Sequence, residues 1–225
     1  MSQLQSNEAT QTPTASEVRS MVERTGPTGI VVGAGGDPLI IGLPIFAVGS
    51  LALGMALIGF VPATALGAVV PIVVFGTGLF LTVVTIWAAL LAQTMVAGIT
   101  GTFAGFWLSL GALLVGLGHN WYGVAAADVS ATQQLFFIAW GALFLFLLIP
   151  TLRLPAIYPA VVGLVVVALA LAATGARTGD VNILKAAGYV ILVFSLLGFC
   201  AFVNVALTAM GAKRPFPPLG PALVS

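Results

Sequence analysis

The sequence predicts an all-α integral membrane protein that crosses the bilayer six times. Of its 225 residues, 60% are hydrophobic and only 6% are charged. Soluble domains carry about 25% charged residues, so this surface is built for lipid rather than for water. No residue from Pro38 to Ala127 carries a formal charge. A soluble fold would have to expose part of that stretch and would aggregate.

Each predicted helix is an apolar run close to the length that a bilayer requires, which is about 20 residues. Gln93 and Thr94 give the only polar interruption between the second run and the third. The second run is long enough to tilt in the membrane. The six predicted helices cover about residues 39–61, 66–92, 94–117, 133–149, 155–173 and 184–210.

Polar segments flank this predicted transmembrane domain, which covers residues 37–212. Residues 1–36 are expected to form a disordered polar cytoplasmic tail, because they hold too little apolar surface to fold. Residues 213–225 are expected to form a Pro-rich cytoplasmic tail. Short cytoplasmic loops are enriched in Lys and Arg. A cytoplasmic N-terminus places Arg19, Arg24, Arg153, Lys213 and Arg214 inside, and only Arg177 and Lys185 outside. We therefore expect a multi-pass protein of the cell membrane with both termini in the cytoplasm.

The predicted helices contain little chemistry for catalysis. The chain has one His and one Cys, and no Asp or Glu lies within the predicted membrane spans. Enzymes need titratable or metal-binding groups at their sites, so the sequence predicts no catalytic residue, no cofactor and no metal site. Ion-coupled carriers hold ionisable groups at membrane depth. A passive route, or one in which the substrate carries its own proton, is the simpler expectation. A net charge of +1 also argues against a nucleic-acid partner.

Small residues recur at four-residue spacing on the third predicted helix. They are Ala97, Gly101, Gly105 and Ser109. Such a stripe lets another helix backbone approach closely. Packing within the chain is the favoured interpretation, and contact with another subunit is the alternative.

The start of the first helix resembles a known signature. Residues Asp37 to Leu43 resemble the Asn-Pro-Ala-Pro-Leu-Gly-Leu motif of the acetate uptake transporters, the succinate–acetate permease family, and they keep Pro38, Gly42 and Leu43 of that motif. Further landmarks follow in the order of that family. They are Phe106-Trp107-Leu108, Ala139-Trp140-Gly141, Thr151-Leu152 and Ala187-Gly188-Tyr189. The resemblance covers about residues 37–218.

The resemblance implies a permease or channel for small monocarboxylates such as acetate, with succinate as a further candidate. It implies a ring-shaped homohexamer in membrane lipid, with one solute path in each subunit. The motif residues Asp37, Pro38, Gly42 and Leu43 would then lie at the pore mouth. The family's apolar constriction would fall on Phe46, Phe103 and Val165, or on Leu164 if the alignment shifts by one residue. Such a constriction would control passage by fit and by dewetting. Both a channel and a proton-coupled symporter are compatible with this interpretation.

The sequence departs from the family at three places. Asp37 replaces the signature Asn, Phe103 replaces a Tyr, and the polar segment between the second and third helices is reduced to residues 92–94. Two like charges about 4 Å apart repel by roughly 4 kcal/mol at an effective dielectric near 20, so Asp37 would oppose a carboxylate that passed close to it. These departures motivate two alternatives. One is a pore for a neutral solute such as an undissociated acid, ammonia or water, and the other is a non-conducting membrane scaffold.

Overall fold

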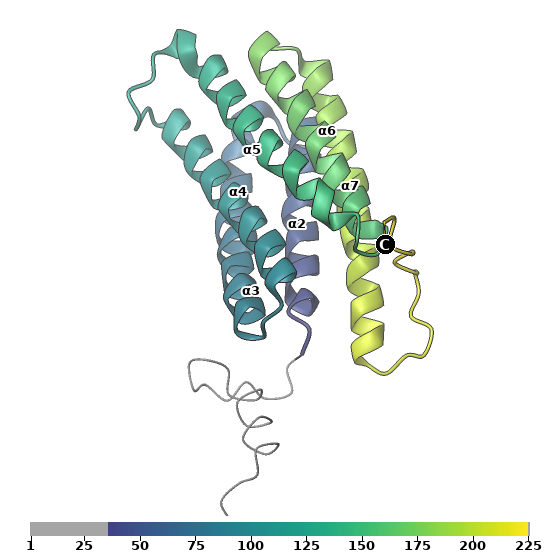
Figure 1. Cartoon of the computed structure of the whole chain (residues 1–225). Helices are drawn as coiled ribbons and strands as arrows, with labels where there is room; N and C mark the ends of the chain where they lie inside the picture. Colours follow the sequence, from purple (N-terminus) through teal and green to yellow (C-terminus); the bar gives the residue numbers. More distant parts are fainter. Residues whose placement is uncertain (1–35, 225) are drawn as a thin grey trace, which may run out of the picture. The chain divides into compact units, whose positions relative to one another are not determined.

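The computed structural model describes residues 36–224, and the predicted disordered tail, apart from Gly36, therefore lies outside the described residues. Within them the chain forms α-helices joined by short connections, with two stretches of tighter or wider helix before α3 (Figure 1). The elements in chain order are α2 (Leu39–Ile58), a 3₁₀ segment η1 (Ala63–Val69), a π-helical segment η2 (Ile72–Gly78), α3 (Leu79–Leu90), α4 (Thr94–Gly118), a 3₁₀ turn η3 (Ala126–Asp128), α5 (Val129–Thr151), α6 (Ile157–Thr178) and α7 (Val181–Ala209).

The six predicted membrane spans are confirmed. Among the described residues, 6 helices are long and apolar enough to cross a bilayer, and they begin and end at Leu39–Ile58, Gly67–Leu90, Thr94–Gly118, Ala126–Thr151, Ile157–Thr178 and Val181–Ala209. The described part holds a single isolated β-bridge, between Pro155 and Ala222, and no strand. We call the end of the bundle where α2 begins and α7 ends the proximal end, and the opposite end the distal end.

Several helix boundaries differ from the prediction because local capping decides them. α2 ends at Ile58 rather than Val61, since Gly59 takes a left-handed conformation (φ 91°) and closes the helix. α7 begins at Val181 rather than Leu184, because the Asp180 side chain accepts a hydrogen bond from the Asn182 amide at 2.8 Å. α6 extends to Thr178 rather than Ala173, where Gly179 (φ 69°) ends it.

The second span also differs from the single α-helix expected over 66–92. Its first half consists of η1 and the π-helical η2, and regular α-helix begins only at Leu79. Thr77 lies in η2, and its hydroxyl donates to the Ile45 carbonyl of α2 at 3.3 Å. A β-carbon on Gly49 would overlap the Thr77 side chain, so a glycine is needed where η2 meets α2.

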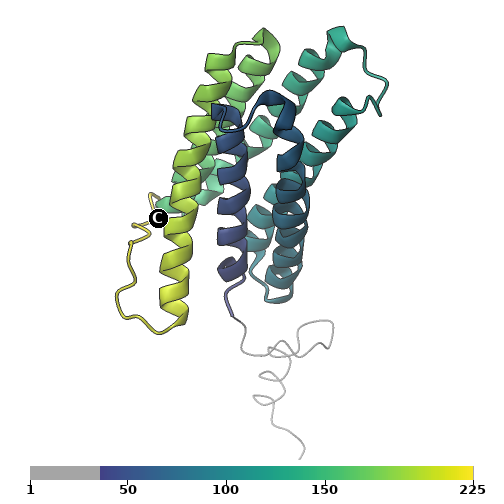
Figure 2. The same ribbon diagram turned by 180° about the vertical axis from the view of Figure 1, so that it is seen from behind.

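α2 and α7 pack closely along their length, and Figure 2 shows α2 between α7 and α3. A β-carbon on Gly188 would lie 3.0 Å from the Gly54 carbonyl oxygen, and one on Gly54 would lie 3.1 Å from the Gly188 carbonyl oxygen. Small residues at such a crossing let two membrane helices approach closely. The Ser195 hydroxyl of α7 also donates to the Ala47 carbonyl of α2 at 2.8 Å. These contacts make α2 and α7 a closely packed pair.

The remaining helices form two further pairs, α3 with α4 and α5 with α6. Two glycines of the small-residue stripe on α4 pack within the chain. β-carbons on Gly101 and Gly105 would lie 3.1 Å from Thr85 Cγ2 and 3.0 Å from Trp140 Cη2. This geometry agrees with the favoured intrachain interpretation, and a contact with another subunit stays a prediction. α5 crosses the face of the bundle in Figure 1, and only 11% of its apolar span is buried.

The Pro-rich segment after α7 folds back onto the bundle. Asn204 of α7 donates through Nδ2 to the carbonyls of Pro217 at 2.7 Å and Pro215 at 3.3 Å. Near the start of α6, the amides of Ala156 and Ile157 donate to carbonyls of this segment, each at 3.0 Å. The first amides of a helix lack acceptors within the helix. Carbonyl groups of the C-terminal segment supply acceptors here, in place of water.

Candidate functional site

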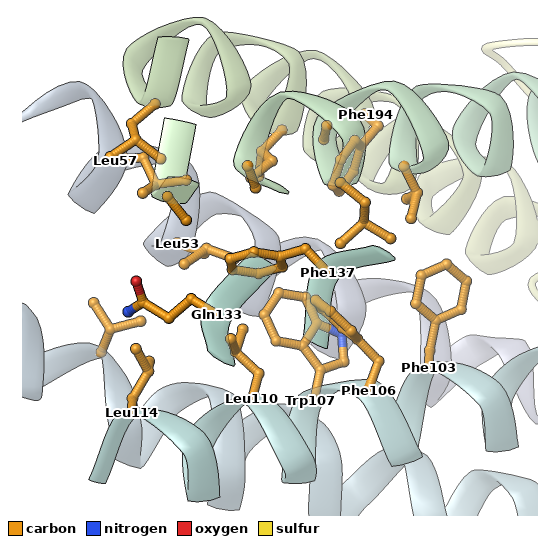
Figure 3. A pocket seen from close by; sticks show the side chains of 18 of the residues that line it. Leu53, Leu57, Phe103, Phe106, Trp107, Leu110, Leu114, Gln133, Phe137 and Phe194 are labelled. Carbon is orange, nitrogen blue, oxygen red and sulfur yellow. The ribbon is translucent and has the colours of Figure 1, made fainter. Parts of the chain in front are cut away.

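A cavity of about 200 Å³ lies in the distal half of the bundle (Figure 3). We call it the distal cavity. Side chains from α2, α4, α5, α6 and α7 surround it, together with Val69 of η1. The lining is apolar except for the Gln133 amide and the Trp107 indole, and Figure 3 shows Gln133 at one end of it and Phe103 at the other.

A second cavity, of about 130 Å³, lies in the proximal half. We call it the proximal cavity. It is bounded by the first turns of α2, α4 and α6, by Leu81 of α3, by Gly198 and Ala201 of α7 and by Leu154. Thr100 and Tyr158 carry its only side-chain hydroxyls.

Phe46 and Phe103 line both cavities and form the wall between them. Their ring centroids are 4.7 Å apart in an edge-to-face arrangement, and both side chains are buried, at 6% and 7% exposure. Phe194 of α7 stacks on Phe46 with centroids 5.8 Å apart, and Phe144 of α5 lies 4.8 Å from Phe103. We call the pair Phe46 and Phe103 the aromatic constriction.

The helix register places these rings in the wall. On α4, residues spaced by three or four positions share one face, and Val96, Ile99, Phe103, Leu110 and Leu114 all line a cavity. Gly198 of α7 makes room for the Phe46 ring, because a β-carbon there would lie 3.3 Å from Phe46 Cδ1. The constriction therefore depends on an aromatic on α2 and a glycine opposite it.

The structure brings together most of the predicted constriction. Val165 is buried and lines the distal cavity beside Phe46 and Phe103. Leu164 is partly buried against the core and is absent from both linings, so the geometry favours Val165 of the two alternatives. The role of these residues in conduction stays a prediction.

The signature residues lie at the proximal end and divide into two groups. Gly42 and Leu43 line the proximal cavity, and Pro38 is fully buried at the start of α2. Asp37 is exposed and lines neither cavity. Its Oδ1 accepts a hydrogen bond from the Leu39 amide at 2.9 Å, which holds the carboxylate at the helix N-terminus.

Serine and threonine hydroxyls inside the helices mostly bond to backbone carbonyls, including that of Thr100 in the proximal cavity. Ser50 donates to the Phe46 carbonyl at 2.7 Å, and Thr100 Oγ1 lies 2.8 Å from the Val96 carbonyl oxygen. Hydroxyls of membrane helices commonly bond to their own backbone in this way. Among residues 36–224, no group of three or more His, Cys, Asp or Glu side chains could hold a metal ion.

Sequence reasoning did not single out most residues of the two linings, among them Trp107, Gln133, Tyr158 and Phe194. Trp107 stands inside one of the landmark motifs, which drew attention to its position without indicating its role. The others carry no local pattern that separates them from ordinary packing residues.

Comparisons with known proteins agree with this architecture. A solved structure described as the bacterial acetate channel SatP superposes with a TM-score of 0.72 and 22% sequence identity, and the match covers 82% of this chain and 99% of that one. This likeness shows a shared fold. No match is found among curated proteins. A sequence model of the GPR1/FUN34/yaaH family matches residues 26–214, which is most of the chain. The chain therefore belongs to the GPR1/FUN34/yaaH family, and the predicted family relationship is confirmed.

Proposed function

We propose that this protein is a membrane permease or channel for small monocarboxylates such as acetate, with succinate as a second candidate. One observation carries the proposal: two apolar cavities lie in one bundle and share the Phe46–Phe103 wall. Rotation of these two rings would join the cavities without separation of the helices. The similarity to the acetate channel SatP supports the choice of substrate.

The wall chemistry indicates which form of the acid crosses the constriction. No Asp, Glu, His, Lys or Arg lines either cavity. Moving a carboxylate from water into such surroundings costs several kcal/mol when no cation compensates it. An undissociated acid avoids most of this cost. We therefore include in the proposal that the monocarboxylate passes the constriction with its proton.

Uptake of radiolabelled acetate into proteoliposomes tests the proposal. We expect uptake above that of empty vesicles, which set the background because acetic acid also crosses lipid unaided. At a fixed total acetate concentration, the protein-dependent part should rise as the external pH falls, since the undissociated fraction then increases. No uptake above empty vesicles, with the pH gradient in either direction, would overturn the proposal. Uptake that does not change with external pH would reject only the proposal that the acid crosses the constriction in its protonated form.

The same preparation separates the proposal from a general pore for neutral solutes such as ammonia or water and from a non-conducting scaffold, neither of which any observation favours. A pore for neutral solutes would give osmotic swelling with water-soluble neutral compounds as readily as acetate uptake. A non-conducting scaffold would give neither signal. No catalytic activity is part of the proposal, in keeping with a transport family.

Assembly and topology complete the proposal. We propose a homohexamer in the cell membrane with both termini cytoplasmic. An even number of crossings places the start of α2 and the end of α7 at the same side. Native mass spectrometry of the detergent-purified protein measures the subunit number. Labelling of single cysteines placed at the two helix-bundle ends, in a variant without Cys200, measures the orientation.

A further inference from the structure

One buried polar atom, on a residue that lines the distal cavity, has no partner. Trp107 is 2% exposed, and its Nε1 is the only buried side-chain nitrogen or oxygen without a hydrogen bond among the described residues. The other buried polar side chains illustrate the contrast. Ser195 and Thr77, for example, donate to backbone carbonyls of α2. The Trp107 indole is therefore the exception among the buried polar side chains of the described residues, which otherwise have a hydrogen-bond partner.

Packing alone does not explain the exception. A buried donor left without an acceptor costs about 1–3 kcal/mol, and a Phe at this position would fill similar space without that cost. The Phe106 ring lies nearby, with centroids 5.2 Å apart in an edge-to-face arrangement. An N–H directed at an aromatic face replaces only part of a hydrogen bond to oxygen. Buried indoles usually find a full partner.

The position of the indole relates it to the solute path. Trp107 follows Phe103 by four residues on α4, so both side chains share one face of the helix. Phe103 belongs to the constriction, and Trp107 lines the distal cavity one helical turn further toward the distal end. Figure 3 shows the indole among the lining side chains, between Leu110 and Phe103. A solute that waits at the distal side of the constriction would lie beside the indole, and the ring would turn for its buried Nε1–H to meet the solute.

We propose that the Trp107 Nε1–H donates a hydrogen bond to a carboxyl oxygen of a solute held in the distal cavity. This inference rests on the proposed function and names the residue that holds the substrate. An N–H group can only donate, so it selects a solute with an exposed oxygen acceptor and gives nothing to an ammonium ion. Because the cavity holds no charged side chain, this donor and the Gln133 amide supply its polar recognition.

The contact accounts for the unpartnered donor and for the apolar walls together. The carboxyl group would bond to the indole while its short hydrocarbon part contacts the apolar lining. Gln133, at the opposite end of the lining from Phe103, offers a second polar group, its side-chain amide (Figure 3). A solute would thus meet Gln133 first, then Trp107, and then the constriction.

Acetate transport by the full-length protein in proteoliposomes tests the donor. Trp107→Phe keeps a ring and removes the N–H, and we expect the half-saturating acetate concentration to rise about tenfold, which corresponds to about 1.4 kcal/mol for one hydrogen bond. Trp140→Phe is the matched control, because Trp140 packs in the same aromatic group but is absent from the cavity lining. It should leave the half-saturating concentration unchanged. Trp107→His, which restores a ring N–H, should recover part of the loss.

A second measurement does not depend on the Trp107 variants. The chain has four Trp residues, and replacing Trp87, Trp121 and Trp140 by Phe leaves Trp107 as the only indole. Titration of this ¹⁵N-labelled variant with acetate should move the indole N–H resonance downfield, and sodium chloride at equal ionic strength should not move it.

The outcomes separate the inference from the function. Wild-type acetate flux combined with an unchanged Trp107→Phe variant and an unmoved indole resonance would overturn the inference and keep the permease. An indole shift without flux in the wild-type protein would keep the binding site and reject the permease.

Discussion

The two cavities differ in what they offer a solute, although the same two rings bound them. The distal cavity is the larger, at about 200 Å³ against about 130 Å³, and it contains the unpartnered Trp107 N–H. In the proximal cavity the Thr100 hydroxyl is already engaged with the Val96 carbonyl and with Thr85 at 2.9 Å. The docked C-terminal segment adds Leu219 to the apolar cluster of Leu43, Ala201 and Val205, against which Tyr158 also packs. The holding site that we propose lies on the larger, distal side of the constriction, and the proximal cavity offers the Tyr158 hydroxyl instead.

Removing a constriction ring should have the largest effect. Phe103→Ala deletes one side of the wall and joins the two cavities, so acetate flux should increase and selectivity against larger acids should fall. The same change should lower the free energy of unfolding by about 3–5 kcal/mol, as loss of a buried Phe usually does. Flux assays and denaturant unfolding in detergent measure the two effects.

Phe146→Ala is the control for this variant, because Phe146 of α5 is 71% exposed and lines neither cavity. It should change neither flux nor stability appreciably. If Phe103→Ala conducts no more than the wild-type protein, the wall does not limit passage and the scaffold alternative gains support.

Narrowing the constriction should act in the opposite direction. In Gly198→Ala the new methyl group would lie 3.2 Å from Ala47 Cβ and 3.3 Å from Phe46 Cδ1. Either the Phe46 ring moves toward Phe103 or α7 moves away, so we expect lower flux and a loss of about 1–3 kcal/mol of stability.

The comparison for this second variant is Gly98→Ala. Gly98 is an exposed helical position, and a β-carbon added there would meet no atom within 4 Å. Alanine is the better helix former, so Gly98→Ala should gain about 0.5–1 kcal/mol and leave flux unchanged. Equal flux in both variants would show that Gly198 does not set the position of the Phe46 ring.

A smaller effect is expected at the proximal end, where the C-terminal segment docks. Asn204→Ala removes the donor to the Pro215 and Pro217 carbonyls, at a cost of about 1–2 kcal/mol. The segment should loosen, and the Ala156 and Ile157 amides that donate to it should exchange hydrogen faster. Hydrogen–deuterium exchange measures this directly. Asn182→Ala, at the distal end, should leave exchange at these amides unchanged, and equal exchange in both variants would contradict the docking.

The sequence predicted the spans but not all of their ends. Apolar length alone places six membrane helices, whereas the first residue of α7 depends on a single bond to the Asp180 side chain. Phe46 and Phe103 could be placed because they stand at fixed distances from recognisable motifs. The unpartnered N–H of Trp107 could not be predicted, because it depends on which carbonyls the folded bundle leaves nearby. The docking of a Pro-rich segment leaves no periodic pattern in the sequence either.

Substitution of Asp37 should have the smallest effect on acetate flux. It tests the difference from the family signature that most opposes a carboxylate substrate, namely an Asp in place of the Asn. Its carboxylate lines neither cavity and accepts a hydrogen bond from the Leu39 amide, a bond that an Asn side-chain oxygen could also accept. Asp37→Asn should therefore cost at most about 0.3–1 kcal/mol, from the lost charge at the helix N-terminus. Acetate flux should change by less than about twofold. If the carboxylate instead stood about 4 Å from the passing anion, the repulsion of roughly 4 kcal/mol would correspond to nearly a thousandfold, and its removal would raise flux steeply. A steep rise would place the anion beside Asp37 and would contradict transit of the protonated acid.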